Sequence, residues 1–324
     1  MKKVLIGLII LTITLLGISL NQEQNTIIIY ASSEQFRNDE LQKQLNEKFP
    51  ELNVYVMYVS TAKAAAKISV EGSETDADIL LGLETAYLEK IKNHLEPVTQ
   101  YSRIPYVEDM TKHDNRYVIW ERQAGSIVIN NDVLKKYNLP MPKTYEDLLN
   151  PVYKNLIAMP DPKSSGTGYF FYKGLDNVWG SEKTLEYFDK LSKNIKQFTE
   201  SGSGPIKLLI QGEVAIGLGL TFQAVGEVNN NQNFTVIEPE FGSPYSLTGT
   251  AMIQGRANDE DITRVFEYIV NEFMVYDKEY FSPGVVYEGQ INKIDNYPKN
   301  IRYADMQGIE LTSEKERLLN LWKY

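Results

Sequence analysis

Short apolar runs alternate with amphipathic stretches along most of the chain. Residues 26–30, 52–60 and 77–82 form apolar runs, and a helix-compatible segment follows each of the first two. Strands that alternate with helices predict βαβ units on a mostly parallel sheet. Similar runs recur in the middle of the chain, and residues 259–280 and 312–323 have the pattern of helices. The pattern therefore predicts an α/β protein in which helices cover a central sheet.

Polar residues stand directly after each of these three apolar runs. In open α/β sheets, ligands bind beyond the carboxyl ends of the strands. The strand ends therefore predict a ligand cleft, with Ser32, Ser33 and Glu84 as candidate binding residues. The alternative is local, because a serine at such a position can cap the next helix and Glu84 can be a solvated helix start.

The segment 160–171, PDPKSSGTGYFF, changes abruptly from small polar residues to aromatic ones. If a helix begins near Thr167 or Gly168, its backbone N–H groups and its dipole favour an anionic oxygen at that point. The alternative is that Ser165 or Thr167 only caps this helix. The candidate residues of this anion cradle are Ser164, Ser165, Gly166, Thr167 and Gly168.

The overall composition limits the classes of function. A chain of 324 residues is long enough for about two domains. The net charge of −10 opposes binding to nucleic acid or to an anionic membrane, so an anionic ligand has to be captured by local groups. The absence of cysteine excludes disulfides, thiolate metal sites and lipid attachment to a cysteine.

The first residues have the pattern of a secretory signal peptide. Residues 1–3 are a short basic region, residues 4–16 are apolar, and small residues follow at Gly17 and Ser19. We therefore expect residues 1–19 to direct export to the extracellular face of the membrane or to the periplasm. The alternative is an uncleaved membrane anchor.

Four blocks of sequence resemble the extracellular solute-binding proteins of bacterial ABC importers, in the iron/phosphonate-type branch. They are YASS at 30–33, DADILLGLE at 76–84, the long block 125–168, and LLIQGEVAIGLG at 208–219. The long block is the most specific of the four. Its strand ending in Asn, Leu-Pro turn, Thr-x-x-Asp-Leu-Leu helix start and Pro-Asp-Pro before a Ser/Gly loop occur together in that family. The likeness covers about residues 26–275.

The resemblance implies a two-lobed type II periplasmic-binding-protein fold. This is an α/β architecture in which each lobe has a central, mostly parallel sheet flanked by helices. Lobe one would comprise residues 25–122 plus 249–324, and lobe two, inserted, residues 126–245. Two crossing segments, near 121–125 and 242–249, would form the hinge.

The same resemblance implies a transport function. A small solute would be enclosed between the lobes by hinge closure and delivered to the transmembrane subunits of an ABC permease. Neither an enzyme activity nor a cofactor is implied, and we expect a monomer that does not bind nucleic acid.

The chain departs from its ferric-binding relatives at the ligand site. Those proteins usually have two adjacent tyrosines after the strand that matches GEVA, and these positions fall on Phe222 and Gln223 here. The histidine often found in their first loop is replaced near Glu34. Glu84 matches an acidic ligand of those relatives, but the missing phenolates disfavour their ferric site. Thr221 and Gln223 suit hydrogen bonds to an organic solute instead.

Two further candidates lie at the expected hinge. Arg122 has the geometry for a bidentate contact with a carboxylate or phosphate, although a surface ion pair with Glu121 is equally consistent. Tyr245 can stack on a ligand or donate a hydrogen bond to it. Together with the anion cradle, these residues favour a small organic anion, such as a phosphonate or phosphate ester, as the solute.

Two other functions compete with this interpretation. One is a metal (ferric iron) carrier with atypical oxygen ligands, including Glu84 and Tyr245. The other is a secreted hydrolase with a serine of the anion cradle as nucleophile, but that chemistry needs a nearby base. The two histidines, His94 and His113, lie outside the candidate segments, and the chain has no Gly-x-Ser-x-Gly motif.

Overall fold

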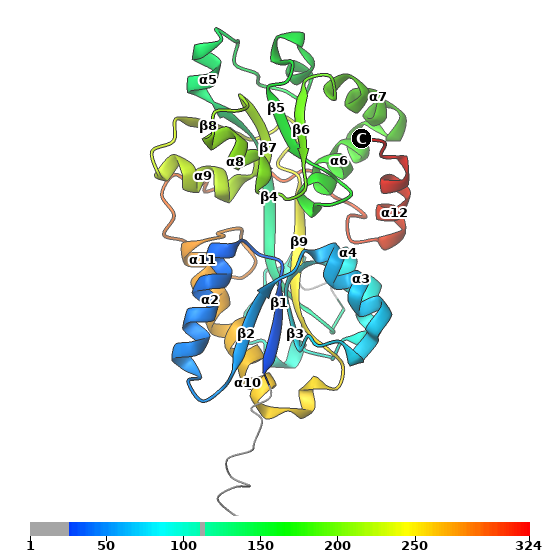
Figure 1. The fold of residues 1–324 in the computed structure, drawn as a ribbon, viewed down its shortest axis with the longest axis vertical. Coiled ribbons are helices and arrows are strands. Elements are labelled where there is room, and N and C mark those ends of the chain that lie inside the picture. The colour runs from blue at the N-terminus through cyan, green and yellow to red at the C-terminus, as the bar shows by residue number, and fades with distance from the viewer. Residues whose placement is uncertain (1–25, 111–113) are drawn as a thin grey trace, which may run out of the picture.

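The computed structural model describes residues 26–110 and 114–324, and the predicted signal peptide at 1–19 lies outside the described residues. The described chain forms two stacked α/β lobes joined by two long strands (Figure 1). Lobe one is the lower half of that view and contains the first strands, and lobe two is the upper half. Within the described ranges, no helix has the length and apolar character needed to span a bilayer.

Lobe one begins with three strands, each followed by a helix, and ends with a broken helix. Its elements are β1 (Ile27–Ala31), α2 (Gln35–Lys48), β2 (Val54–Tyr58), α3 (Thr61–Glu71), β3 (Ile79–Glu84), α4 (Thr85–Ile91), α10 (Glu260–Tyr268), a π turn (Ile269–Phe273) and α11 (Met274–Tyr280). β1 lies between β2 and β3 and runs parallel to both. These are the βαβ units that the alternating pattern predicts.

Lobe two repeats this arrangement with its own strands and helices. Its elements are α5 (Asn131–Lys136), β5 (Ile157–Pro160), α6 (Gly166–Trp179), α7 (Ser181–Leu191), β6 (Ile195–Thr199), α8 (Gly204–Ile210), β7 (Ile216–Leu220), α9 (Thr221–Asn229) and β8 (Phe234–Ile237). β5 runs parallel to β6 and to β7. Short 3-10 turns occupy 72–74, 92–94, 99–101, 108–110, 146–149, 151–153 and 256–258.

Two antiparallel strands, β4 (Val118–Asn130) and β9 (Tyr245–Met252), connect the lobes (Figure 1). The polar run of Glu121, Arg122 and Gln123 does not interrupt β4, which is one strand of 13 residues. It changes partner within its length, because Ala124 pairs with β9 and Gly125 pairs with β7. The buried Glu121 of this strand accepts hydrogen bonds from Arg37 and Gln123.

Each lobe is stabilised by its own apolar cores. In lobe one, Ile29 and Phe266 belong to a core on one face of the sheet, and Tyr30 and Ile68 to a core on the other. The core of lobe two is strongly aromatic. The aromatic end of the segment 160–171 continues into α6 as buried Tyr169, Phe170, Phe171 and Tyr172, which explains its abrupt change of character.

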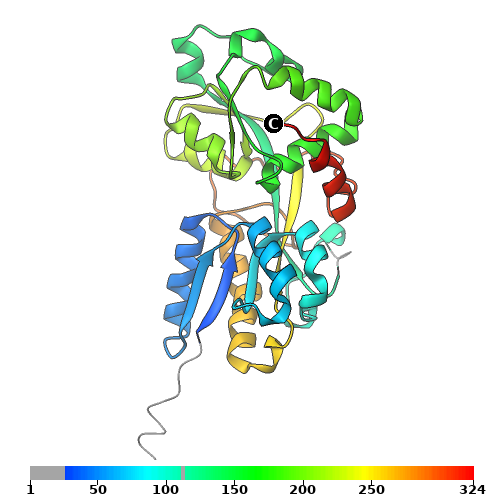
Figure 2. The same ribbon diagram turned by 45° about the vertical axis from the view of Figure 1, so that its right-hand side comes forward.

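The C-terminal segment returns to lobe two, which differs from the expected assignment of residues 249–324 to lobe one. Helix α12 (Thr312–Leu321) lies against lobe two at its boundary with lobe one, as Figure 2 shows. Leu318 and Trp322 are buried in the lobe two core, together with Met306 and Ile309. The chain therefore crosses between the lobes a third time, within residues 281–303. An amphipathic pattern shows that a helix has a buried face, but not which lobe that face covers.

Gly168 is required by close packing at the start of α6. A Cβ atom there would lie 2.4 Å from the carbonyl oxygen of Pro160 and 2.6 Å from the carbonyl carbon of Asp161. We expect Gly168→Ala to destabilise the protein by about 1–3 kcal/mol, because backbone atoms have to move. Gly226 in α9 has open space around its Cβ position, so Gly226→Ala should instead stabilise by about 0.5–1 kcal/mol. Urea unfolding of the two variants tests this, and equal effects would contradict it.

Candidate functional site

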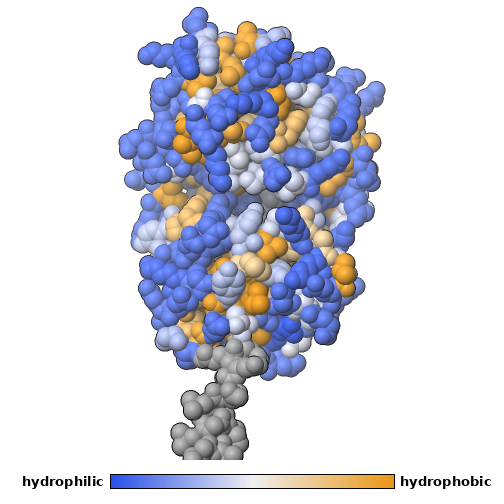
Figure 3. Space-filling view, in the orientation of Figure 1, coloured by the Kyte–Doolittle hydropathy of each residue, from blue (hydrophilic) through white to orange (hydrophobic). Residues whose placement is uncertain are grey.

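A cavity of about 1750 Å³ lies between the lobes. Its walls come from the carboxyl ends of β2 and β6, from the helix starts that follow β1 and β7, and from residues 280–295 of the third crossing. Figure 3 shows one face of the molecule, which is hollowed along the boundary between the halves, where hydrophilic and hydrophobic residues both occur. The cavity is therefore at the strand ends where the sequence predicts a ligand cleft.

Several helices begin at this cavity, and within the described residues no N-cap side chain accepts a hydrogen bond from their first backbone N–H groups. Helices α2, α3, α8 and α9 begin beside it, and residues of their first turns line it at Gln35, Lys63, Ile206 and Phe222. In the described structure, none of the four N-cap side chains accepts a hydrogen bond from the first N–H groups of its helix. The first N–H groups of a helix need acceptors, and the helix dipole favours negative charge beside them. The cavity therefore presents hydrogen-bond donors from both lobes.

The charged side chains of the cavity have mixed sign. Lysines are contributed by both lobes and by the third crossing, at Lys63, Lys207 and Lys293. Carboxylates outnumber them and include Glu34, Asp39, Asp161, Glu200, Glu227 and Asp295. Carboxylates accept hydrogen bonds, so this lining suits a ligand that carries hydroxyl groups as well as negative charge.

Two predicted binding residues, Ser164 and Gln223, line the cavity. The Oε1 atom of Gln223 is buried and has no hydrogen-bond partner among the described residues. A buried acceptor of this kind is normally satisfied, so a donor on a ligand would complete its hydrogen bonding.

Other predicted hydroxyl residues are engaged within their own lobes. The Oγ of Ser32 donates to the carbonyl oxygen of Val59 at 2.7 Å, and the Oγ of Ser33 donates to Oδ1 of Asn38 at 2.6 Å. Thr221 and Ser126 form a hydroxyl pair at 2.7 Å. These side chains brace the loops beside the cavity and do not line it.

The anion cradle faces a carboxylate of the same chain. Helix α6 begins at Gly166, close to the predicted start, with Ser165 at the N-cap position and Thr167 buried. A Cβ atom on Gly166 would lie 2.6 Å from Oε2 of Glu84 in lobe one. Glu84 therefore supplies negative charge to the N-terminus of α6.

Glu84 has a second partner that the sequence interpretation missed. Lys315 of α12 donates to both carboxylate oxygens of Glu84 at 2.7 Å, and both side chains are buried. Lys315 lies on the same face of α12 as Leu318 and Trp322, at helical spacing. That spacing was the one available signal that this lysine is buried. Glu84 is thus paired, which removes the alternative of a solvated helix start.

Arg122 and Tyr245 contact each other at the hinge. The Arg122 guanidinium lies 5.2 Å from the Tyr245 ring centroid and 4.6 Å from that of Tyr303, in cation–π geometry. Arg122 is buried, so the alternative of a surface ion pair with Glu121 is wrong. Glu121 instead belongs to a separate buried network.

This buried network, centred on Arg37 of α2, was also missed by the sequence interpretation. Arg37 donates to both carboxylate oxygens of Asp277 at 2.8 and 2.7 Å, to Glu121 at 3.1 Å and to Glu34 at 2.9 Å. Burial alone would raise the pKa of Asp277, but the charges of Arg37 and Lys278 hold it below its ordinary value. Burial raises the pKa of Glu34, although Arg37 opposes this shift. The network joins α2, β4 and α11 beside the cavity.

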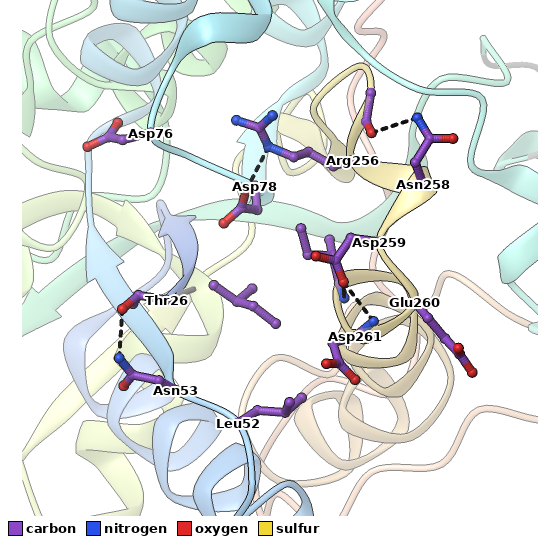
Figure 4. A pocket seen from close by; sticks show the side chains of 13 residues that line it. Thr26, Leu52, Asn53, Asp76, Asp78, Arg256, Asn258, Asp259, Glu260 and Asp261 are labelled. Atoms are coloured by element: carbon purple, nitrogen blue, oxygen red, sulfur yellow. Dashed lines mark hydrogen bonds and ion pairs between the residues drawn. The ribbon is translucent and has the colours of Figure 1, made fainter. Parts of the chain in front are cut away.

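A second cavity, of about 850 Å³, lies at the opposite end of lobe one. Figure 4 shows that Asp76, Asp78, Asp259 and Asp261 line it, with Arg256 bound to Asp78. This cavity adjoins the amino end of β1, away from the interlobe region. Ligands of open α/β sheets bind at the carboxyl ends of strands, so the interlobe cavity is the candidate site.

Comparison with known proteins defines the class of this protein. The family model described as "Bacterial extracellular solute-binding protein" matches residues 77–283, and the chain belongs to this family. An uncharacterized protein of Haemophilus influenzae is 25% identical over 245 residues, which is 72% of this chain and 69% of that protein.

Solved structures share the fold. The periplasmic binding protein AfuA from Actinobacillus pleuropneumoniae, with exogenous fructose-6-phosphate bound, has a TM-score of 0.79 at 20% identity, covering 92% of this chain and 97% of that one. The periplasmic binding protein P5PA has a TM-score of 0.77 at 21% identity, covering 92% and 98%. Apo ferric ion-binding protein A of Pasteurella haemolytica has a TM-score of 0.74 at 16% identity, covering 92% and 96%.

These findings confirm the family and the type II periplasmic-binding fold predicted from the sequence. The chain is a substrate-binding component of an ABC importer, which binds a small ligand for delivery to a permease. Members of this family are solute-binding proteins and not enzymes, so the hydrolase hypothesis is wrong.

Proposed function

We propose that the protein captures a small organic anion, a phosphate ester or phosphonate, in the interlobe cavity. The observation that carries this proposal is the set of helix starts at one cavity, with α2 and α3 from lobe one and α9 from lobe two. Uncapped N-termini bind anionic oxygens through backbone N–H groups and the helix dipole. Donors from both lobes would be satisfied together only when the lobes close on the solute.

The side chains of the cavity refine the class of solute. Lys63 and Lys207, from opposite lobes, add positive charge for an anionic group. The more numerous carboxylates disfavour a ligand that is anionic throughout, but they suit the hydroxyl groups of a polyol or sugar. We therefore favour a phosphate ester with a hydroxylated organic part. The fold shared with AfuA, whose structure holds fructose-6-phosphate, supports this choice.

Ferric iron is the competing solute, because ferric-binding proteins share the fold. In the part of the chain that the structure describes, no group of three or more His, Cys, Asp or Glu side chains is arranged to hold a metal ion. Glu84, the acidic residue that matches a ferric ligand, already forms an ion pair with Lys315. An organic solute therefore fits the described residues better.

We further propose that the lobes rotate about β4, β9 and the segment 281–303, and that the protein acts outside the cytoplasmic membrane as a monomer. The family's extracellular role supports the location. The signal peptide at 1–19 stays a prediction, because it lies outside the described residues.

Thermal unfolding with a panel of solutes tests the ligand class. A hexose phosphate, glycerol phosphate and an alkylphosphonate are compared with the unphosphorylated sugar and with ferric citrate. A ligand at 100 times its Kd adds about 2.7 kcal/mol to the stability of the native state, so Tm should rise by several degrees with a phosphorylated compound. A rise with ferric citrate or the plain sugar, and with no phosphorylated compound, would refute the proposal.

A further inference from the structure

The ammonium group of Lys315 is enclosed by a carboxylate and two aromatic rings. Its Nζ lies 2.7 Å from each carboxylate oxygen of Glu84, 4.4 Å from the ring centroid of Tyr87 and 4.2 Å from that of Tyr169. The side chains of Lys315 and Glu84 are only 6% and 4% exposed. A carboxylate with aromatic faces around it is a recognised environment for binding an ammonium ion. We call these four residues the ammonium box.

The ammonium box is assembled from both lobes. Glu84 ends β3 and Tyr87 lies in α4, and both belong to lobe one. Tyr169 lies in α6 of lobe two, and Lys315 lies in α12.

We expect helix α12 to move with lobe two, because its buried apolar residues pack there, although Thr312 also donates to the carbonyl oxygen of Ala86 in lobe one. Trp322 packs with its ring centroid 5.1 Å from that of Tyr172. Lys173 donates to Glu314 at 2.8 Å, and Arg317 donates to Asp176 at 3.1 Å. Opening of the hinge would therefore separate Lys315 from Glu84.

The ion pair of the box joins lobe one to α12 in the arrangement that the structure describes. Burial lowers the pKa of Lys315, and the charge of Glu84 opposes that shift. Separating such a pair is costly when either charge stays buried and unpaired. Glu84 also faces the N-terminus of α6, so opening would remove two favourable partners from the same carboxylate.

We infer that Lys315 is a tethered internal cation that fills an interlobe ammonium site and latches the lobes together along α12. The solute then binds in the 1750 Å³ cavity, which none of the four box residues lines. Because Lys315 is paired with Glu84, this carboxylate is not available to a metal ion or a cationic solute. Lys315 is therefore a determinant of specificity. This inference does not depend on which solute the protein transports.

Truncation of Lys315 tests the inference by chemical rescue. Lys315→Ala removes three methylene groups and the ammonium group, which together correspond to n-propylammonium. We expect this ion, at tens of millimolar, to raise the Tm of K315A by about 2–4 °C in a saturable manner. It should not raise the Tm of the wild type, in which the box is filled, and neutral n-propanol should not raise that of K315A.

Small-angle X-ray scattering of the protein without solute tests the latch. The radius of gyration of K315A should exceed that of the wild type, and n-propylammonium should reduce it again. Lys90→Ala is the matched control, because it removes the exposed ion pair between α4 and Glu316 of α12. Its radius of gyration should equal that of the wild type.

Either of two results overturns the inference. One is a K315A protein whose Tm responds to n-propylammonium no more than that of the wild type. The other is a K315A protein as compact as the wild type. Should K315A fail to fold, Lys315→Met, which fills the space without the charge, takes its place in the scattering experiment. A compact K315M would equally overturn the latch.

Discussion

Replacing Arg37 with methionine is expected to lower the free energy of unfolding by about 3–5 kcal/mol. The guanidinium is the shared partner of Asp277, Glu121 and Glu34, and its side chain is 1% exposed. Its removal leaves buried carboxylates with too little compensating charge, which is the costly way to break a buried ion pair. Lys278 still faces Asp277 in the variant, but among the described residues Glu121 keeps as hydrogen-bond donors the hydroxyl of Ser282 and the amide of Gln123.

Urea unfolding measures this effect, with Arg264→Met as the matched control. Arg264 is also an arginine with two acidic partners, Glu51 and Asp261, but it is 44% exposed. Exposed ion pairs contribute little, so R264M should lose less than about 1 kcal/mol. If R37M were no less stable than R264M, the network would not have the structural role assigned to it.

Replacing Trp322 with alanine is expected to cost about 3–5 kcal/mol, because a large buried side chain is removed and a cavity remains. Trp322 is 2% exposed and packs against Tyr172, Phe188 and Phe198 of lobe two. Since α12 carries Lys315, this variant should also weaken the contact between α12 and lobe one.

Hydrogen exchange locates the effect of W322A within the molecule. Protection should fall in α6 and α7 of lobe two and remain near the wild-type level in β1 and β3 of lobe one. Leu321→Ala is the control on the same helix, because Leu321 is 41% exposed and should contribute little. Loss of protection mainly in lobe one would show that the C-terminal helix belongs there, as the resemblance to the family implies.

The sequence predicted the features of the fold that depend on local pattern. Alternating apolar and amphipathic segments identified the βαβ units, and polar strand ends identified the side of the sheets that forms the cleft. The start of α6 at Gly166 lies close to its predicted position, because glycine and hydroxyl residues there interrupt an otherwise aromatic run. Each of these signals lies within a few residues of the structure that it predicts.

The features that escaped prediction depend on partners far away in the sequence. Arg37 and Asp277 are 240 residues apart, and Glu84 and Lys315 are 231 residues apart. The helical spacing of Lys315 with Leu318 and Trp322 indicates that this lysine is buried, but no local pattern identifies Glu84 as its partner or distinguishes Arg37 and Asp277 from exposed residues. The burial of Glu121 within β4 likewise depends on a distant residue, because its ion pair is with Arg37 from another element.

The sequence predicted the position of the candidate site more accurately than the directions of its side chains. The strand ends do border the interlobe cavity, but Ser32 and Ser33 direct their hydroxyl groups into lobe one. The direction of a side chain within a loop depends on the hydrogen-bond partners available, which a sequence pattern does not specify. The anion cradle was identified as a place for negative charge, and in the structure the Glu84 carboxylate lies against it.

The most direct test of the account compares the affinity of two Gly226 variants for a hexose phosphate by isothermal titration calorimetry. Gly226 lines the interlobe cavity, and a side chain there has open space. Gly226→Gln and Gly226→Glu add nearly the same volume and differ in charge. A negative charge near an anionic solute costs about 1–2 kcal/mol, so G226E should bind the hexose phosphate roughly tenfold more weakly than G226Q. Equal affinities, or tighter binding by G226E, would contradict the binding of an anionic solute in this cavity.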